Sequence, residues 1–172
     1  MTATPTPNRL VDWSPEYAAT FAELRDFLMP AVAPLGGTVE HVGSTSVRGM
    51  YGKPVLDVDA VLPARDSVPA AVVALTELGY RHRGDLGVAG REAFDRPAQL
   101  PLHHMYVVVE GSAAHHDHVD LRDYLRSSPS AVQRYAVRKR ELADVLATDR
   151  TAYTEAKSDV VQQLLSEARA RR

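Results

Sequence analysis

The sequence contains no cysteine, and this absence removes several kinds of chemistry. Disulfide bonds, thiolate nucleophiles, iron–sulfur clusters and cysteine-ligated zinc are all excluded. No apolar run approaches the roughly 20 residues that a membrane-spanning helix needs, so we expect no membrane association. Residues 1–8 are polar and proline-rich and do not resemble a secretory signal. We therefore expect a disordered start to the chain and a cytoplasmic protein.

The chain also lacks an excess of charge of one sign. It has 20 basic and 22 acidic residues, and its formal net charge is −2. Without a global positive field, a protein is not drawn to nucleic acid or to anionic lipid, and we expect neither as a partner. Lysine is scarce beside arginine, whereas alanine and valine are abundant. This composition is typical of a GC-rich bacterial genome.

The length and composition of the chain suit one domain, which we expect to span residues 1–172. Hydrophobic residues make up 45% of the chain and suffice for one core. Ser14-Pro15-Glu16 predicts a helix start, and Pro30 and Pro34 predict its end. Alternating apolar residues predict strands over 38–42, 54–62 and 102–109, with a helix over 67–78 and a short hairpin within 80–94. Further helices are predicted over 112–126, 130–146 and 149–169. This order indicates an α+β fold with a mixed or largely antiparallel sheet and C-terminal helices.

A Gly-Ser pair directly follows the first predicted strand and suits anion binding. At Gly43-Ser44 the missing side chain lets backbone N–H groups approach an anion, and Ser44 adds a hydroxyl. Thr45 and Ser46 continue the small polar segment. Because such turns are common, the pair alone is a weak signal.

Two carboxylates follow on the next predicted strand. Asp57 and Asp59 are two positions apart, so both side chains lie on one face, roughly 6–7 Å apart along the strand. Like charges on a buried strand repel and resist desolvation, and a Mg²⁺ ion bound by both would relieve the repulsion. The alternatives are a solvent-exposed face or an aspartate paired with an arginine. Apolar neighbours on both sides favour a central strand and weaken these alternatives.

The combination of a strand, the Gly43-Ser44 pair and an Asp-x-Asp pair on the next strand, with Asp57 thirteen residues after Ser44, resembles the signature of polymerase-β-like nucleotidyltransferases. The segments 40–49 and 53–58 resemble the GrpB family more closely. That family is assigned to the same superfamily and also occurs fused behind dephospho-CoA kinase. The resemblance continues along most of the chain, in Asp12-Trp13, residues 90–94, residues 101–104, residues 121–126, Tyr135-x-x-x-Lys139 and Tyr153-x-x-x-Lys157. It implies the superfamily fold but names no reaction.

The sequence departs from the family pattern at two positions. Arg48 replaces a usual proline, and His104-x-Tyr106 replaces a His-x-His pair, which puts a histidine-rich metal site in doubt. In the superfamily a neighbouring strand supplies a third acid, and the 102–109 strand has none. We therefore expect His104 to take that place as ligand or general base. The run His115-His116-Asp117-His118 is interpreted as a solvated helix start.

A polyphosphate site without a P-loop needs cations. Lys53 lies near the Gly-Ser turn, while Arg91, Arg122 and Lys139 stand within family motifs. We expect all four to bind phosphate. The alternative is salt bridges to acids nearby in sequence, which are Asp120, Asp123 and Glu141.

Two functions remain open at this point. The first is a nucleotidyltransferase that uses Mg²⁺, held by Asp57 and Asp59, and a nucleoside triphosphate on an unknown acceptor. The second is a non-catalytic module that binds a nucleotide or a CoA precursor. Either would take a nucleotide or phosphorylated small molecule as its ligand, and the oligomeric state stays open.

Overall fold

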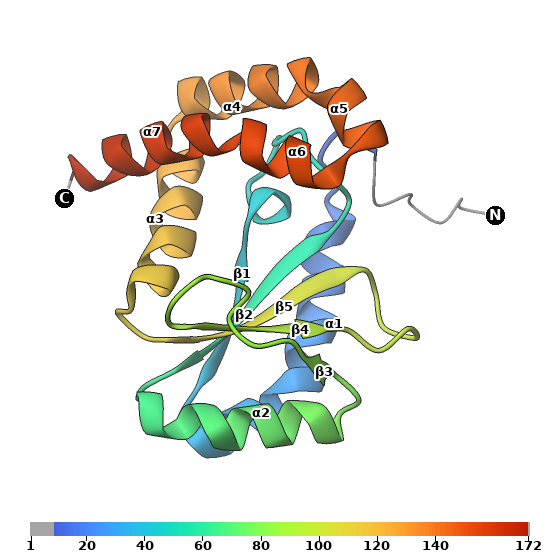
Figure 1. The fold of residues 1–172 in the computed structure, drawn as a ribbon, viewed down its shortest axis with the longest axis vertical. Helices are drawn as coiled ribbons and strands as arrows, with labels where there is room; N and C mark the ends of the chain where they lie inside the picture. The colour runs from blue at the N-terminus through green and yellow to red at the C-terminus, as the bar shows by residue number, and fades with distance from the viewer. Residues whose placement is uncertain (1–8, 172) are drawn as a thin grey trace.

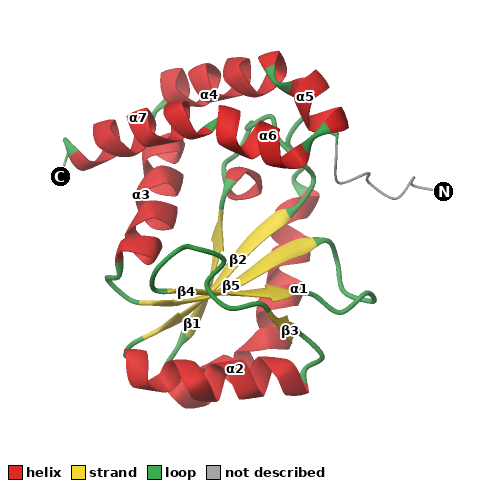
Figure 2. Cartoon of the chain, in the orientation of Figure 1, coloured by secondary structure: helices red, strands yellow, loops and turns green. Residues whose placement is uncertain are grey.

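A computed structural model describes residues 9–171, and the expectation of disorder over residues 1–8 lies outside the described residues. A five-stranded mixed sheet forms the centre, in the order β1-β2-β5-β4-β3 (Figures 1 and 2). Among the strands within residues 9–171, the β2–β5 pair is parallel and the other pairs are antiparallel. The strands are β1 (Thr38–Val42), β2 (Leu56–Leu62), β3 (Arg81–His82), β4 (Arg91–Asp95) and β5 (His103–Val109).

One face of the sheet carries the main hydrophobic core. Val58, Ala60 and Leu62 alternate along β2 and pack with apolar residues of helices α1 (Glu16–Val32) and α2 (Val68–Glu77). Because strand side chains alternate, Asp57 and Asp59 point to the opposite face.

Helices cover part of that opposite face. Helix α3 (Ala113–Ser127) begins beside β2 and β5, where Ala114 packs with Val61 and Val108, and leads away to the remaining helices. Those helices lie together at one end of the molecule (Figure 1) and are α4 (Pro129–Glu141), α5 (Ala143–Thr148), α6 (Arg150–Ala156) and α7 (Ser158–Arg169). Residues of α3, α4 and α7 share a second core with the segment after β1. The face bearing the two aspartates therefore looks toward a helical wall.

The sequence predicted the order of elements and most strand bounds, but not every helix boundary. Pro30 lies inside α1 rather than ending it. It stands in the last turn, where the missing N–H costs a single bond, and the N–H of Ala33 still bonds to the carbonyl of Met29. The last two predicted helices, over 130–146 and 149–169, are each broken, at Leu142 and at Lys157. No helix within residues 9–171 is long and apolar enough to cross a membrane.

Candidate functional site

Asp57 and His104 meet across the parallel pair of strands. They are register partners on β2 and β5, and His104 Nδ1 lies 2.8 Å from Asp57 Oδ1. Arg150 Nη2 lies 2.8 Å from His104 Nε2. Because an arginine only donates, Nε2 accepts this bond, and the imidazole proton is on Nδ1, facing Asp57. Burial opposes ionisation of Asp57, but the His104 hydrogen bond and nearby positive charge outweigh it and lower the pKa of Asp57 to about 2. Asp57 is thus held as a carboxylate.

Asp59 has a different environment, although it shares the same face. Its side chain is fully buried, whereas that of Asp57 is 30% exposed. His118 Nδ1, from α3, lies 2.8 Å from Asp59 Oδ2, and Asp59 Oδ1 has no hydrogen-bond partner. Burial raises the pKa of Asp59. Burial also disfavours charged His118, yet the hydrogen bond and charge of Asp59 outweigh it and raise the pKa of His118. The pair therefore retains a proton.

The Gly-Ser turn packs directly against Asp57. Gly43 has φ +68° and ψ −170°, a conformation nearly restricted to glycine. A Cβ atom at Gly43 would lie 2.1 Å from Asp57 Oδ2. A glycine is therefore required here both by the backbone and by the carboxylate beside it. The turn continues into a short 3₁₀ helix, Ser44–Ser46.

Lys139 reaches the turn from α4. Its side chain is buried, and its Nζ lies 2.6 Å from Ser44 Oγ and 3.0 Å from the carbonyl oxygen of Tyr51. The ring of Tyr135 lies beneath it, with the centroid 4.1 Å from Nζ. Gly52 leaves the necessary space, since a Cβ there would lie 3.2 Å from Nζ. Burial, and then the charge of Lys157, lower the pKa of Lys139 well below its ordinary value.

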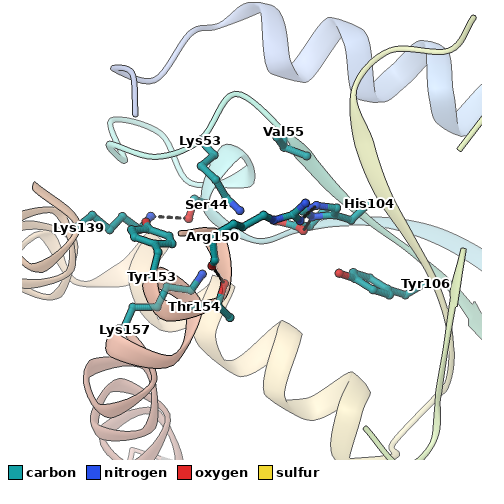
Figure 3. Close-up of a pocket in the computed structure, with 11 residues that line it drawn as sticks. Ser44, Lys53, Val55, His104, Tyr106, Lys139, Arg150, Tyr153, Thr154 and Lys157 are labelled. Atoms are coloured by element: carbon teal, nitrogen blue, oxygen red, sulfur yellow. Dashed lines mark hydrogen bonds and ion pairs between the residues drawn. The ribbon is translucent and has the colours of Figure 1, made fainter. Parts of the chain in front are cut away.

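A cavity of about 190 Å³, which we call the polar cavity, is lined by Ser44, Asp57, His104, Lys139 and Arg150 but not by Asp59 (Figure 3). Its lining has three cations and one carboxylate, which are Lys53, Arg150, Lys157 and Asp57, together with the buried amine of Lys139. Burial, and then the charges of Arg150 and Lys157, lower the pKa of Lys53 to about 8. The local excess of positive charge suits an anionic ligand, although the chain as a whole is slightly acidic.

A second cavity of about 430 Å³ adjoins the first and is called the adjoining cavity. It shares Ser44, Asp57 and Lys157 with the polar cavity, but apolar side chains from α3, α4 and α7 form much of its wall. Arg91 and Arg122 line it. The guanidinium carbon of Arg91 lies over the Tyr106 ring, 4.6 Å from the ring centroid. Arg122 Nη1 lies 2.7 Å from Glu40 Oε2.

The structure therefore brings together most, but not all, of the residues predicted from the sequence. Gly43, Ser44, Asp57 and Lys139 meet around the polar cavity, with Lys53 and His104 beside them. The side chains of Thr45 and Ser46 point elsewhere. Thr45 Oγ1 is buried 2.9 Å from His41 Nε2, and Ser46 Oγ donates to the carbonyl of Gly43. Arg122 forms the salt bridge to Asp123 that was considered as the alternative, together with one to Glu40.

Sequence reasoning missed two residues of this site. Arg150 was not considered, and His118 was interpreted as part of a solvated helix start, which is wrong because it contacts buried Asp59. A signal for His118 existed in the apolar spacing of α3, which places it on the same stripe as Ala114 and Leu121. For Arg150, an exposed residue at a helix start, we find no signal in the sequence.

The family model described as GrpB protein matches residues 7–167. The chain belongs to the GrpB family. The UPF0157 protein YqkA of Bacillus subtilis is 31% identical over 140 residues, which cover 80% of this chain and 41% of YqkA. UPF0157 protein PA4798 of Pseudomonas aeruginosa is 32% identical over 161 residues, which cover 91% of this chain and 65% of that protein. This GrpB chain thus spans less than two thirds of either relative.

Solved structures show that the GrpB chain has a nucleotidyltransferase-like fold. The crystal structure of conserved protein GrpB from Enterococcus faecalis superposes with a TM-score of 0.70 at 21% identity, covering 90% of this chain and 98% of that one. Cid1 poly(U) polymerase with bound MgGTP superposes with a TM-score of 0.50 at 16% identity, covering 75% of this chain and 45% of that one. At these identities the likeness concerns the fold alone.

Proposed function

We propose that this GrpB protein binds a nucleoside triphosphate with Mg²⁺ and transfers its nucleotidyl group, or a related phosphoryl group, to an acceptor. The observation that carries the proposal is the polar cavity, in which three cations and the Lys139 amine surround ionised Asp57 and the Gly43-Ser44 turn. Nucleotidyl transfer depends mainly on positioning and charge neutralisation, and this cavity offers both. The MgGTP bound by Cid1 on a related fold supports the same ligand class.

Asp57 lines both cavities, and Asp59 lies fully buried on the same face of β2, so together they would hold a magnesium ion whose coordination the ligand completes. Carboxylate oxygens suit Mg²⁺, and Asp59 Oδ1 is buried with no hydrogen-bond partner, so a cation would satisfy it. Within residues 9–171 no three histidine, aspartate or glutamate side chains are grouped to hold a metal. Mg²⁺ commonly uses one or two carboxylates together with substrate phosphates and water, which agrees with this pair. When bound, the ion would neutralise phosphate charge and polarise the reacting phosphorus.

The chain's own residues would bind and orient the phosphates. Lys53, Arg150 and Lys157 reach the polar cavity from different elements and provide donors to phosphate oxygens (Figure 3). His104 donates to Asp57 and accepts from Arg150, so the carboxylate is held in one orientation. The adjoining cavity meets the polar cavity at Ser44 and Asp57 and offers room for the rest of the ligand or for the acceptor.

One observation favours the second candidate, a non-catalytic module that binds a nucleotide or a CoA precursor. The positions of β5 that pair with Asp57 and Asp59 are His104 and Tyr106, so the strand supplies no third carboxylate. A binding module needs the cations and the Gly-Ser turn but not a complete catalytic metal site.

Two experiments separate the two functions. The first is a thermal-shift screen of nucleoside triphosphates and CoA precursors, with and without Mg²⁺. The second is an assay for release of pyrophosphate and phosphate. Saturating ligand at 100 times its Kd should stabilise the protein by about 2.7 kcal/mol. For an enzyme, Asp57→Asn should lower Mg²⁺-dependent turnover by about 100-fold or more. Asp66→Asn, at an exposed aspartate outside both cavities, is the matched control. Binding without turnover supports the module, and binding of no nucleotide or CoA precursor contradicts both functions.

A further inference from the structure

Lys139 is a buried amine without a carboxylate partner. It is 2% exposed, and within residues 9–171 no aspartate or glutamate forms an ion pair with it. Its Nζ contacts are the hydroxyl of Ser44 at 2.6 Å, the carbonyl of Tyr51 at 3.0 Å and the ring of Tyr135. An unpaired buried ammonium is strongly disfavoured, so the free protein favours the neutral amine.

A neutral Lys139 can keep both of its hydrogen bonds, because the Ser44 hydroxyl can donate as well as accept. The amine then has two N–H groups and one lone pair. With one N–H on the carbonyl of Tyr51, the lone pair can turn toward Ser44, and the 2.6 Å contact then runs from the hydroxyl to the amine instead of from the amine to the hydroxyl. A buried amine beside a serine hydroxyl is a known way to generate a serine nucleophile.

Ser44 is also placed to meet an electrophile. It lines both cavities, next to Asp57, and Lys53, Arg150 and Lys157 line the same polar cavity. These cations would draw in an electrophile that carries negative oxygens and would stabilise charge that develops on it. A phosphorus centre of a phosphoanhydride has this chemistry.

We infer that Ser44 is a nucleophile toward the terminal phosphorus of a nucleoside triphosphate, with Lys139 as its general base. The identity of the phosphoryl donor rests on the proposed function, whereas the reactivity of Ser44 does not. In the step, Ser44 Oγ forms a bond to the terminal phosphorus, and the bond from that phosphorus to its bridging oxygen breaks. The nucleoside diphosphate leaves with the electron pair, and the Ser44 proton moves to Lys139 Nζ. The product is phosphorylated Ser44, from which water or an acceptor hydroxyl takes the phosphoryl group.

Ser46 provides an internal comparison on the same turn. Its hydroxyl donates to the carbonyl of Gly43 at 2.7 Å, and within residues 9–171 no lysine is hydrogen-bonded to it; the guanidinium of Arg126 bonds instead to its carbonyl oxygen. Ser46 should therefore show the reactivity of an ordinary serine.

The first experiment exposes the full chain to a fluorophosphonate, which labels activated serines, and locates the adduct by peptide mass spectrometry. We expect labelling at Ser44 in the parent and in Ser46→Ala. Lys139→Arg keeps N–H donors at this position but cannot accept a proton, so labelling should fall by about 100-fold. Absence of an adduct at Ser44, or labelling of folded Lys139→Arg at the parent rate, overturns the inference.

A second measurement avoids any change at buried Lys139. The chain has no cysteine, so in Ser44→Cys a thiol reagent reports on that position alone. The pH dependence of its alkylation should give a thiol pKa below the ordinary value of about 8.5, whereas Ser46→Cys should titrate near that value. Equal thiol pKa values in the two variants overturn the inference.

The phosphoryl donor is tested with a nucleoside triphosphate labelled at the terminal phosphate, together with Mg²⁺. Transfer of label to Ser44 in the parent, and its absence in Ser44→Ala, supports the step. Binding of the nucleotide without transfer to Ser44 overturns the step. If no nucleotide binds, the proposed function fails, and the fluorophosphonate experiment alone decides whether Ser44 is activated.

Discussion

Replacing Gly43 with alanine tests how closely the Gly-Ser turn is packed against Asp57. The φ of +68° and ψ of −170° at Gly43 should cost an alanine about 1–3 kcal/mol. The added Cβ would also lie 2.1 Å from Oδ2, 2.8 Å from Cγ and 2.9 Å from Cβ of Asp57. Overpacking of this kind costs about 1–3 kcal/mol more. Gly43→Ala should therefore lower the free energy of unfolding by about 2–6 kcal/mol.

The matched control is Gly49→Ala in the same segment. Gly49 has φ +78°, but a Cβ there would meet no atom within 4 Å, so only the backbone cost of about 1–2 kcal/mol applies. Urea unfolding at pH 7 measures both variants. Adding Asp57→Ala to Gly43→Ala removes Oδ2 and Cγ and should recover part of the loss. Equal destabilisation by the two glycine substitutions, or no recovery in the double variant, would refute the proposed packing of Asp57 against the turn.

Two further predictions concern the charged groups. His118→Ala leaves buried Asp59 without a partner and should cost about 3–5 kcal/mol in urea unfolding at pH 7. Adding Asp59→Asn to His118→Ala should recover part of the lost stability. A loss below about 1 kcal/mol for His118→Ala would mean that the pair does not stabilise the fold. Lys53, whose pKa is lowered to about 8, is charged below that pH and neutral above it. Triphosphate affinity measured by calorimetry should therefore fall as pH rises from 7 to about 9.5. The fall should be smaller in Lys53→Met. The same dependence of affinity on pH in the parent and in this variant would contradict a role for Lys53 in binding.

Local patterns in the sequence were enough for much of the fold. Period-two alternation predicted β1 and β5 almost to the residue, and it placed Asp57 and Asp59 on one face. Ser112 was predicted to start a helix, and its hydroxyl does accept from the N–H of His115. These signals worked because strand alternation and helix capping depend on residues within a few positions of one another.

The chemistry of the site depended on contacts that no local pattern contains. Ser44 and Lys139 are 95 positions apart, and Asp59 and His118 are 59 apart. The two aspartates look alike in sequence, yet α3 covers Asp59 completely and leaves Asp57 partly open to the cavity. Burial disfavours the charged form of each group, and the partners that packing supplies outweigh burial at Asp57 but not at Asp59 or Lys139. The sequence alone determined the elements and the carboxylate face, and tertiary packing decided which side chains meet there and in what charge state.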